Sequence, residues 1–323
     1  MGVVRLPRLA YPSHTLLPLC SPGIMNSSNC SSLDANPVYY TYMGGLLALG
    51  LLLNGLALWV LCWRLPRWTE TRIYMANLAV ADLCLLCALP SFLYFQKQTS
   101  KDTPLCQISQ AVYLLNRYMS ISLVTAIAVD RYVAVRHPLR ARRLRSPGRA
   151  AAVCTALWAV VLGSLVLRWF LDVQDGGFCF AVRSGRSTYT GVFSLLGFYL
   201  PLAVLVFCSL QVVTALTQRP EANPGQAEAT QKASRMVLAN LAVFVVCFLP
   251  FHMVLTMRVA LGLQTCAIKV AMQITSRLSD ANCCLDVICY YFMAKEFQEA
   301  SVSTTSPRAK AHKSKDSVTM TLT

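Results

Sequence analysis

Charged residues are scarce in this 323-residue sequence: Asp, Glu, Lys and Arg make up 13% of it, against about a quarter of an average soluble protein. Hydrophobic residues make up 55%. A soluble domain of this length rarely carries so little charge, so the composition argues against one. Alternating strand patterns and internal repeats are also lacking, which argues against a β-sheet protein or a repeat array.

Long apolar stretches recur instead. We place them at about 40–63, 73–96, 105–129, 150–171, 189–216, 236–258 and 270–292. Each is close to the ~20 residues that a helix needs to cross a bilayer. We therefore expect an all-α membrane protein with seven spans over residues 40–293. Residues 1–39 would form the extracellular N-terminus, and 294–323 a short amphipathic helix and a disordered cytoplasmic tail.

The positive charge indicates the orientation. Lys and Arg gather in the connections 64–72, 136–149 and 219–235, and fewer lie in the alternating connections. Because cytoplasmic loops carry the excess of basic residues, the N-terminus is expected outside, in a multi-pass plasma-membrane protein. The net charge of +15 is explained by this topology and by contact with anionic membrane lipids, so nucleic acid is not an expected partner.

The first residues do not read as a signal peptide, because the prolines within 1–24 interrupt any apolar core. Met25 begins a segment that resembles a natural start, so 1–24 are interpreted as an alternative-start extension. Asn26 and Asn29 both fit the N-glycosylation pattern on the predicted outer side.

Four cysteines of the predicted outer face are candidates for disulfides: Cys30, Cys106, Cys179 and Cys266. Four cysteines allow three pairings, and the sequence alone does not choose among them. The position of Cys106 at the start of the third span favours Cys179, in the loop after the fourth. Cys30 would then pair with Cys266.

Polar residues inside the spans form a second group of candidates. They are Asn54, Asp82, Asn116, Ser120, Asn282 and Asp286. Carboxylates at this depth usually pair, bind a cation or take up a proton. Oxygen ligands from several helices suit a sodium ion at Asp82, and a packing network without an ion is the alternative. No other cofactor or metal site is expected.

Short motifs occur in order along the spans. They are Asn54, Leu78-Ala-Val-Ala-Asp82, Cys106, Asp130-Arg131-Tyr132, Trp158, Pro201, Phe244-Val-Val-Cys-Phe-Leu-Pro250 and Asp286-Val-Ile-Cys-Tyr290. This set resembles the signature of rhodopsin-like G-protein-coupled receptors over about residues 36–300. The resemblance implies an extracellular ligand, with a heterotrimeric G protein and arrestin as partners.

The resemblance also implies an activation switch. Asp130 would hold Arg131 until the bundle opens and frees it for a partner, a two-state element biased by ligand. The other switch and G-protein-contact candidates are Tyr132, Pro138, Leu139, Phe248, Pro250 and Tyr290. Phe248 and Asp286-Val287 depart from the family's usual Trp and Asn-Pro. Without that proline, the lower part of the seventh span should kink less.

The predicted ligand site is basic. Tyr113 and Arg117 lie one helical turn apart on one face, and Arg168, Arg258 and Lys269 are expected to converge with them at the outer mouth. Because a guanidinium binds carboxylate or phosphate by two parallel bonds, the ligand should be anionic. Pairing of Arg117 with Asp280 inside the bundle is the alternative.

Segments 68–74, 279–286 and 294–300 resemble more closely one receptor that is similar to the purinergic and hydroxycarboxylic-acid branch of the family. This implies kynurenate-type acids or lysophosphatidic-type lipids as ligands, and coupling through the inhibitory and Rho-activating G-protein families. A peptide or chemokine ligand is the alternative. A small transporter is much less favoured, since paired repeats are missing. No nucleophile and base are evident for an enzyme.

The tail is polar, and a family member would be phosphorylated there to recruit arrestin. The candidate sites are Ser301, Ser303, Thr304, Thr305, Ser314, Ser317 and Thr321.

Overall fold

The computed structural model describes residues 37–64, 68–97, 103–174, 188–217, 224–262 and 265–293, all within one compact unit. The described elements are α1 (Pro37–Trp59), a π-helical turn η2 (Val60–Arg64), α2 (Glu70–Lys97), α3 (Pro104–Arg136), α4 (Pro138–Leu144), α5 (Pro147–Gln174), α6 (Thr188–Thr217), α7 (Pro224–Leu261), α8 (Cys266–Asp280) and α9 (Asn282–Met293). The predicted amphipathic helix and tail lie outside the described residues.

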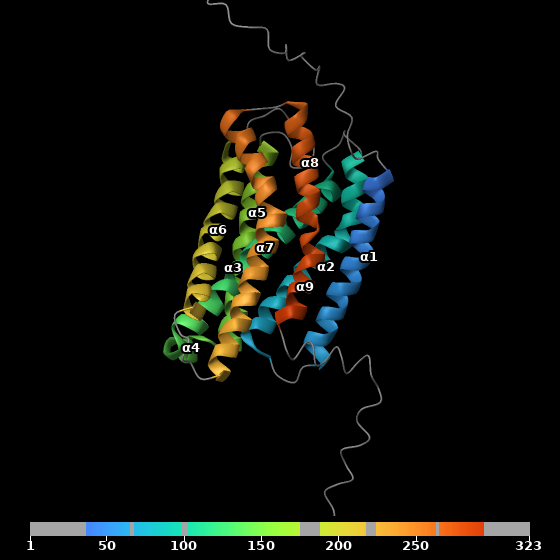
Figure 1. Cartoon of the computed structure of the whole chain (residues 1–323). Coiled ribbons are helices and arrows are strands. Elements are labelled where there is room, and N and C mark those ends of the chain that lie inside the picture. Colours follow the sequence, from blue (N-terminus) through green and yellow to red (C-terminus); the bar gives the residue numbers. More distant parts are fainter. Residues whose placement is uncertain are drawn as a thin grey trace, which may run out of the picture. The chain divides into compact units, whose positions relative to one another are not determined.

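The long helices run side by side in Figure 1. Six are long and apolar enough to cross a membrane by themselves, from α1 with η2 through α7. α8 and α9 together supply the seventh, and α4 is a short helix between α3 and α5. The predicted all-α bundle is therefore confirmed, with α7 beginning about three turns earlier than its apolar stretch predicts.

α3 is the central helix of the bundle. It packs against α2, α5, α6 and α7, and 67% of its most apolar window is buried, against 22% in α5. Large apolar side chains of α5, such as Val160, Val166 and Phe170, are instead exposed. Exposure of this kind suits a helix that faces lipid, where an apolar surface has no cost. Polar side chains on α3 consequently point into the protein.

The limits of α3 follow from its sequence. The Thr103 side chain accepts a hydrogen bond from the backbone N–H of Cys106, and Pro104 occupies the first turn, where a missing N–H costs nothing. At the other end, Pro138 lies two residues after Arg136 and disfavours a helical conformation at His137, which caps the helix. These signals fix both ends of the helix that carries most of the candidate residues.

The seventh span is interrupted at Ala281, between α8 and α9. Its N–H donates to the Leu278 carbonyl at 3.3 Å, and the Cys284 N–H donates to the Ala281 carbonyl at 3.1 Å, so the bonds here span three residues instead of four. α9 then runs unbroken through Asp286 and Val287, as the missing proline predicted. The break that the sequence did not indicate lies five residues earlier.

Candidate functional site

Arg131 is held near the C-terminal end of α3. Its guanidinium donates to Asp130 at 2.5 Å and also hydrogen-bonds the Thr71 hydroxyl of α2. The Asp130 side chain is 8% exposed, so its charge is largely removed from water. Arg145, which follows α4, binds the same carboxylate at 2.8 Å. The pairing that the motif predicted is therefore present, with a second arginine added.

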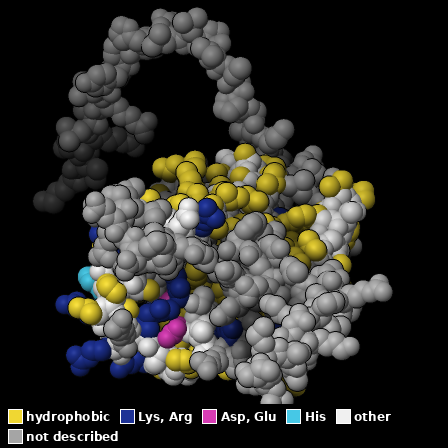
Figure 2. Space-filling model, turned by 60° about the horizontal axis from the view of Figure 1, so that its bottom comes forward, with side chains coloured by type: hydrophobic (Ala, Val, Ile, Leu, Met, Phe, Trp, Pro, Cys, Tyr) yellow, Lys and Arg dark blue, Asp and Glu magenta, His cyan; other side chains and the backbone are white. Residues whose placement is uncertain are grey.

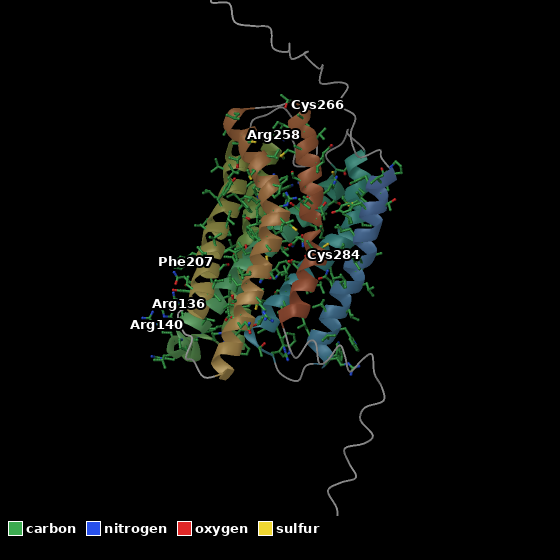
Figure 3. All side chains as sticks on the ribbon, in the orientation of Figure 1. Arg136, Arg140, Phe207, Arg258, Cys266 and Cys284 are labelled. Atoms are coloured by element: carbon green, nitrogen blue, oxygen red, sulfur yellow. The ribbon has the colours of Figure 1, made fainter. Side chains whose placement is uncertain are left out.

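The rest of this end of the bundle joins α3 to α6. Arg136 donates to the Gln211 side chain at 2.8 Å and 3.1 Å, and the Tyr132 ring packs 5.7 Å from Phe207. In Figure 3, Arg136 and Phe207 lie at the same end as Arg140. Figure 2, in which this end comes forward, shows basic side chains gathered around a few acidic ones.

Two predicted contact residues lie beside this end. Pro138 begins α4, and Leu139 follows with 80% of its surface exposed. An exposed leucine beyond the membrane-spanning part has no partner to bury it within the described residues. The side chain of Tyr290 lies outside the described residues.

The polar residues of the middle of the bundle meet around Asp82. The Asn116 amide donates to Asp82 at 2.8 Å, and the Asn282 amide donates to Asp286 at 2.8 Å. Asn54 donates to the Cys283 carbonyl at 2.8 Å, which ties α1 to α9. All these side chains are at most 6% exposed. The sequence predicted that these residues belong to one group, and the structure shows which of them are hydrogen-bonded to each other.

Four buried oxygens of this group have no hydrogen-bond partner among the described residues. They are Asn54 Oδ1, Asp82 Oδ2, Ser120 Oγ and Asn282 Oδ1, one each from α1, α2, α3 and α9. Buried polar atoms without a partner call for a water or an ion. A carboxylate, two amide carbonyls and a hydroxyl fit a small hard cation.

Arg117 lies in the N-terminal half of α3 with an unusual set of neighbours. It donates to the hydroxyl of Tyr113 at 2.5 Å and to that of Ser276 at 3.3 Å. The centre of its guanidinium lies 4.0 Å from the Phe251 ring centroid and 4.9 Å from that of Tyr113. Only 5% of the residue is exposed. Among the described residues, no carboxylate lies within ion-pair distance of Arg117.

The pairing of Arg117 with Asp280, which the sequence left open, is not found. Asp280 pairs with Arg277 of its own helix at 3.5 Å. The two residues are three positions apart and therefore lie on one face of α8. Arg277 also lies over the Tyr39 ring at 4.8 Å. Asp280 thus has its ion pair with Arg277, and it interacts with Arg117 only over a longer distance. Among the described residues, the direct contacts of the Arg117 guanidinium are with hydroxyls and aromatic rings.

The other predicted ligand-site cations lie near the ends of three other helices. Arg168 is on α5, Arg258 in the last turn of α7 and Lys269 in the first turn of α8, and all three are partly buried. Figure 3 shows Arg258 near Cys266 at the end opposite Arg136. No described contact joins them to Arg117, so their convergence on one site stays a prediction.

The predicted disulfides are described only in part. Cys106 and Cys266 are each disulfide-bonded. Cys30 and Cys179 lie outside the described residues, so the predicted pairing is not decided. The glycosylation candidates Asn26 and Asn29 and the phosphorylation candidates of 301–321 also lie outside them.

An aromatic cluster surrounds the proline of α7. Phe248, 2% exposed, packs edge-on against Phe244 at 5.5 Å, and Phe198 stacks on His252 at 3.9 Å. Pro250 lies inside the helix and cannot donate a backbone hydrogen bond. Phe248 is therefore a core residue, two positions before the proline at which the helix lacks a backbone hydrogen-bond donor.

Sequence reasoning missed several residues. Glu70, Thr71 and Arg145 complete the cluster around Asp130 and Arg131, while Ser276 and Phe251 complete the surroundings of Arg117. Ser276 could have been found, since it lies four residues before Asp280 and one helical turn away. The others carry no local signal, because their roles arise from neighbouring helices.

Comparison with known proteins is consistent with this arrangement. Residues 53–290 match the family described as 7 transmembrane receptor (rhodopsin family). The human G-protein coupled receptor 35 is 66% identical over 309 residues, covering 93% of this chain and 99% of that one. The human lysophosphatidic acid receptor 4 is 34% identical, covering 78% of this chain and 73% of that one.

A third relative, the human G-protein coupled receptor 55, is 35% identical over 77% of this chain and 83% of its own length. All three are receptors and none is an enzyme. The matched region contains α2 to α8, the end of α1 and most of α9, together with the Asp130-Arg131 pair and Arg117. The chain is therefore a multi-pass membrane protein that belongs to the rhodopsin family of seven-transmembrane, G-protein-coupled receptors.

Proposed function

We propose that this receptor recognises an anionic ligand, an aromatic or lipid-like acid, through Arg117. One observation carries the proposal: a 5%-exposed guanidinium with no carboxylate in ion-pair distance among the described residues. Removing a cation from water without a counterion is costly, and a ligand carboxylate or phosphate would supply that counterion. The donors of Arg117 could then bind it in a charge-assisted way.

The neighbours of Arg117 favour a flat, partly apolar acid. Phe251 and Tyr113 present ring faces to the guanidinium, so an aromatic or acyl body would extend an environment that is already apolar. A relative named lysophosphatidic acid receptor 4 supports an acidic lipid as one ligand class, and kynurenate-type acids are the other. Arg168, Arg258 and Lys269 would guide the acid inward.

On the cytoplasmic side, ligand binding would release Arg131 from Asp130, so that the G protein binds. The exposed Leu139 and the arginines around it suit a groove on that partner. We propose the inhibitory and Rho-activating G-protein families, with arrestin binding the phosphorylated tail, in a plasma-membrane protein whose N-terminus is outside.

Asn54, Asp82, Ser120 and Asn282 would hold a sodium ion through the four oxygens that have no partner. The ion would supply a positive charge next to Asp82, whose other oxygen accepts from Asn116. It would bind only the packed bundle, because its ligands come from separate helices.

The test is G-protein dissociation in cells that express the full chain, with each acid compared with its own methyl ester and carboxamide. A response to the acids that is lost with the neutral analogues and with Arg117→Ala is expected. The loss should be about 100-fold in potency, since removing one partner of a buried charge pair costs roughly 2–5 kcal/mol.

Arg277→Gln combined with Asp280→Asn is the matched control. It also removes one arginine of this region, together with that arginine's own carboxylate. We expect a potency change within roughly threefold, because removing both partners of a buried pair can be nearly neutral. Unchanged potency in Arg117→Ala at normal surface expression would refute the acid site and favour a peptide ligand.

A further inference from the structure

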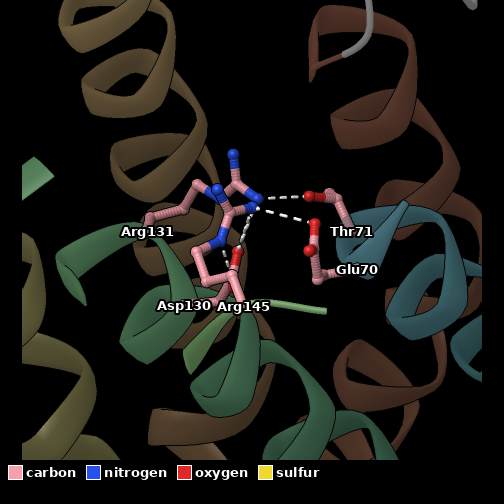
Figure 4. Close-up of polar contacts among 5 residues, drawn as sticks. All are labelled: Glu70, Thr71, Asp130, Arg131 and Arg145. Atoms are coloured by element: carbon pink, nitrogen blue, oxygen red, sulfur yellow. Dashed lines mark hydrogen bonds and ion pairs between the residues drawn. The ribbon is translucent and has the colours of Figure 1, made fainter. Parts of the chain in front are cut away.

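Four charged side chains meet at the cytoplasmic end of the bundle, as Figure 4 shows. Asp130 and Arg131 come from α3, Glu70 from the first turn of α2 and Arg145 from the residue that ends α4. Arg131 and Arg145 both bind Asp130, at 2.5 Å and 2.8 Å. Arg145 also binds Glu70 at 3.3 Å. One buried carboxylate therefore has two arginines.

The two arginines bind Asp130 differently. Arg145 uses two nitrogens and reaches both oxygens, Nε to Oδ1 at 2.8 Å and Nη2 to Oδ2 at 3.2 Å. Arg131 reaches only Oδ2, and its buried Nε has no hydrogen-bond partner. Two parallel bonds are the stronger arrangement. Arg145, the residue outside the motif, is therefore the more completely bound cation.

Other contacts fix both the backbone and the side chain of Arg145. Its backbone N–H donates to the Ala141 carbonyl at 2.8 Å, which ends α4, and Glu70 holds its side chain toward α2. Burial opposes the charge on Arg145, but the hydrogen bonds and charges of Asp130 and Glu70 outweigh it and raise its pKa above the ordinary value. Arg145 thus stays charged and does not depend on α7 for its position.

The charge on Asp130 must be compensated once Arg131 leaves. A carboxylate that is 8% exposed would otherwise need a proton, because an unpaired buried charge is costly. We propose that Arg145 is a standing counterion of Asp130, a positioning residue that lets Arg131 be released without proton uptake. Activation of this receptor is then insensitive to cytoplasmic pH.

The other titratable groups do not replace it. Within the described residues, those that interact with Asp130 are Arg131, Arg145 and, on α2, Tyr74. Cys154 of α5 faces Tyr74, and Glu70 adds negative charge. Once Arg131 has left, Arg145 is the cation that remains in contact with Asp130.

The test measures nucleotide exchange by a G protein in membranes that contain the full-length receptor, without ligand. It runs over about pH 6 to 8, where proton uptake coupled to activation would show as a slope. Each variant is expressed relative to the wild type at the same pH, which cancels the pH dependence of the G protein.

Arg145→Gln is expected to lower nucleotide exchange at the alkaline end of the pH range, because Arg131 is then the one arginine that pairs with Asp130. Exchange should rise on acidification by as much as about tenfold per pH unit, the limit for one proton. Arg145→Lys keeps the positive charge, so its nucleotide exchange relative to the wild type should not change with pH. The double variant Asp130→Asn with Arg145→Gln has no carboxylate to protonate at this position, so its exchange should not change with pH either.

A flat Arg145→Gln profile would overturn the proposal, as would an Arg145→Lys profile as steep as that of Arg145→Gln. Arg145→His gives a second test should Arg145→Gln fail to reach the membrane. Its cation is present only at the acidic end, so a flat profile there contradicts the proposal too.

The inference rests on the proposed release of Arg131, which Asp130→Asn tests separately. Exchange in Asp130→Asn equal to that of the wild type would overturn the switch and this inference together. Raised exchange in Asp130→Asn with a flat Arg145→Gln profile would overturn the inference alone.

Discussion

Two buried arginines on α3 have opposite surroundings. Arg117 is in the outer half, bound by hydroxyls and covered by aromatic rings, with no carboxylate in ion-pair distance among the described residues. Arg131 is fourteen residues further on, ~21 Å along the helix, and it pairs with a carboxylate that a second arginine shares. One helix thus carries an arginine without a counterion and an arginine whose counterion is shared.

The difference suggests what each arginine can do. A cation without an internal counterion gains most when an anion arrives from outside, so Arg117 suits ligand recognition. A cation with an internal counterion can be released, so Arg131 suits a switch. Burial strengthens both effects, because charges interact more strongly away from water. The same residue type serves two roles, and its neighbours decide which.

The largest expected effect comes from giving Arg117 an internal carboxylate. In Ser276→Asp the new carboxylate replaces a hydroxyl that lies 3.3 Å from the guanidinium. It should pair with Arg117 and exclude the ligand acid, lowering agonist potency by about 100-fold, as for other close buried charge pairs. Concentration–response curves at matched surface expression measure this, with Ser276→Asn as the uncharged control. Equal potency in both variants would contradict the comparison.

A smaller effect is expected when Arg131 loses its carboxylate. Asp130→Asn removes the charge that holds Arg131 and should raise ligand-free nucleotide exchange by about tenfold, since hydrogen bonds between charged groups contribute roughly 1.5–3 kcal/mol. Exchange in membranes without ligand measures it. Arg136→Gln, which alters a contact between α3 and α6 but not this pair, is the neighbouring control. A rise of the same size in both variants would show a general loosening of the bundle.

Removal of one hydroxyl beside Arg117 should matter less. Tyr113→Phe keeps the ring over the guanidinium but loses the acceptor at 2.5 Å, while Ser276 remains. We expect a fivefold to tenfold change in acid potency, about the worth of one hydrogen bond. Tyr118→Phe, which loses a hydroxyl contact to Ser194 on another face of α3, is the control. Equal changes in acid potency in the two variants would show that the Tyr113 hydroxyl has no special role in ligand recognition.

The smallest effect concerns Asp82, the buried carboxylate that accepts a hydrogen bond from Asn116 of α3. If sodium binds at Asp82, replacing sodium by a large organic cation should change agonist affinity by no more than about fivefold, the low end of ordinary coupling between sites. Asp82→Asn should abolish that change, and Asp130→Asn should preserve it. Ligand-binding curves with and without sodium measure the difference. A sodium effect that survives Asp82→Asn would place the ion elsewhere.

The class of this protein can be predicted from its amino-acid sequence alone. Low charge and seven apolar stretches predict seven spans because hydropathy is a local property, and Thr103, Pro104 and Pro138 fix the ends of α3 locally. The Asp130-Arg131 pair could also be predicted, since its members are adjacent. Tyr113 and Arg117, one turn apart, were placed on one face correctly.

The contacts between polar groups on different helices could not be predicted in this way and required the folded structure. Arg145 binds Asp130, which lies fifteen positions earlier in the sequence, and it also binds Glu70 of α2. Ser276 of α8 accepts a hydrogen bond from Arg117. The sequence left Asp280 as an alternative partner for Arg117, and the structure gives Asp280 to Arg277. The reason is geometric: the rotation and depth of each helix in the bundle set these meetings, and both depend on how all the helices pack.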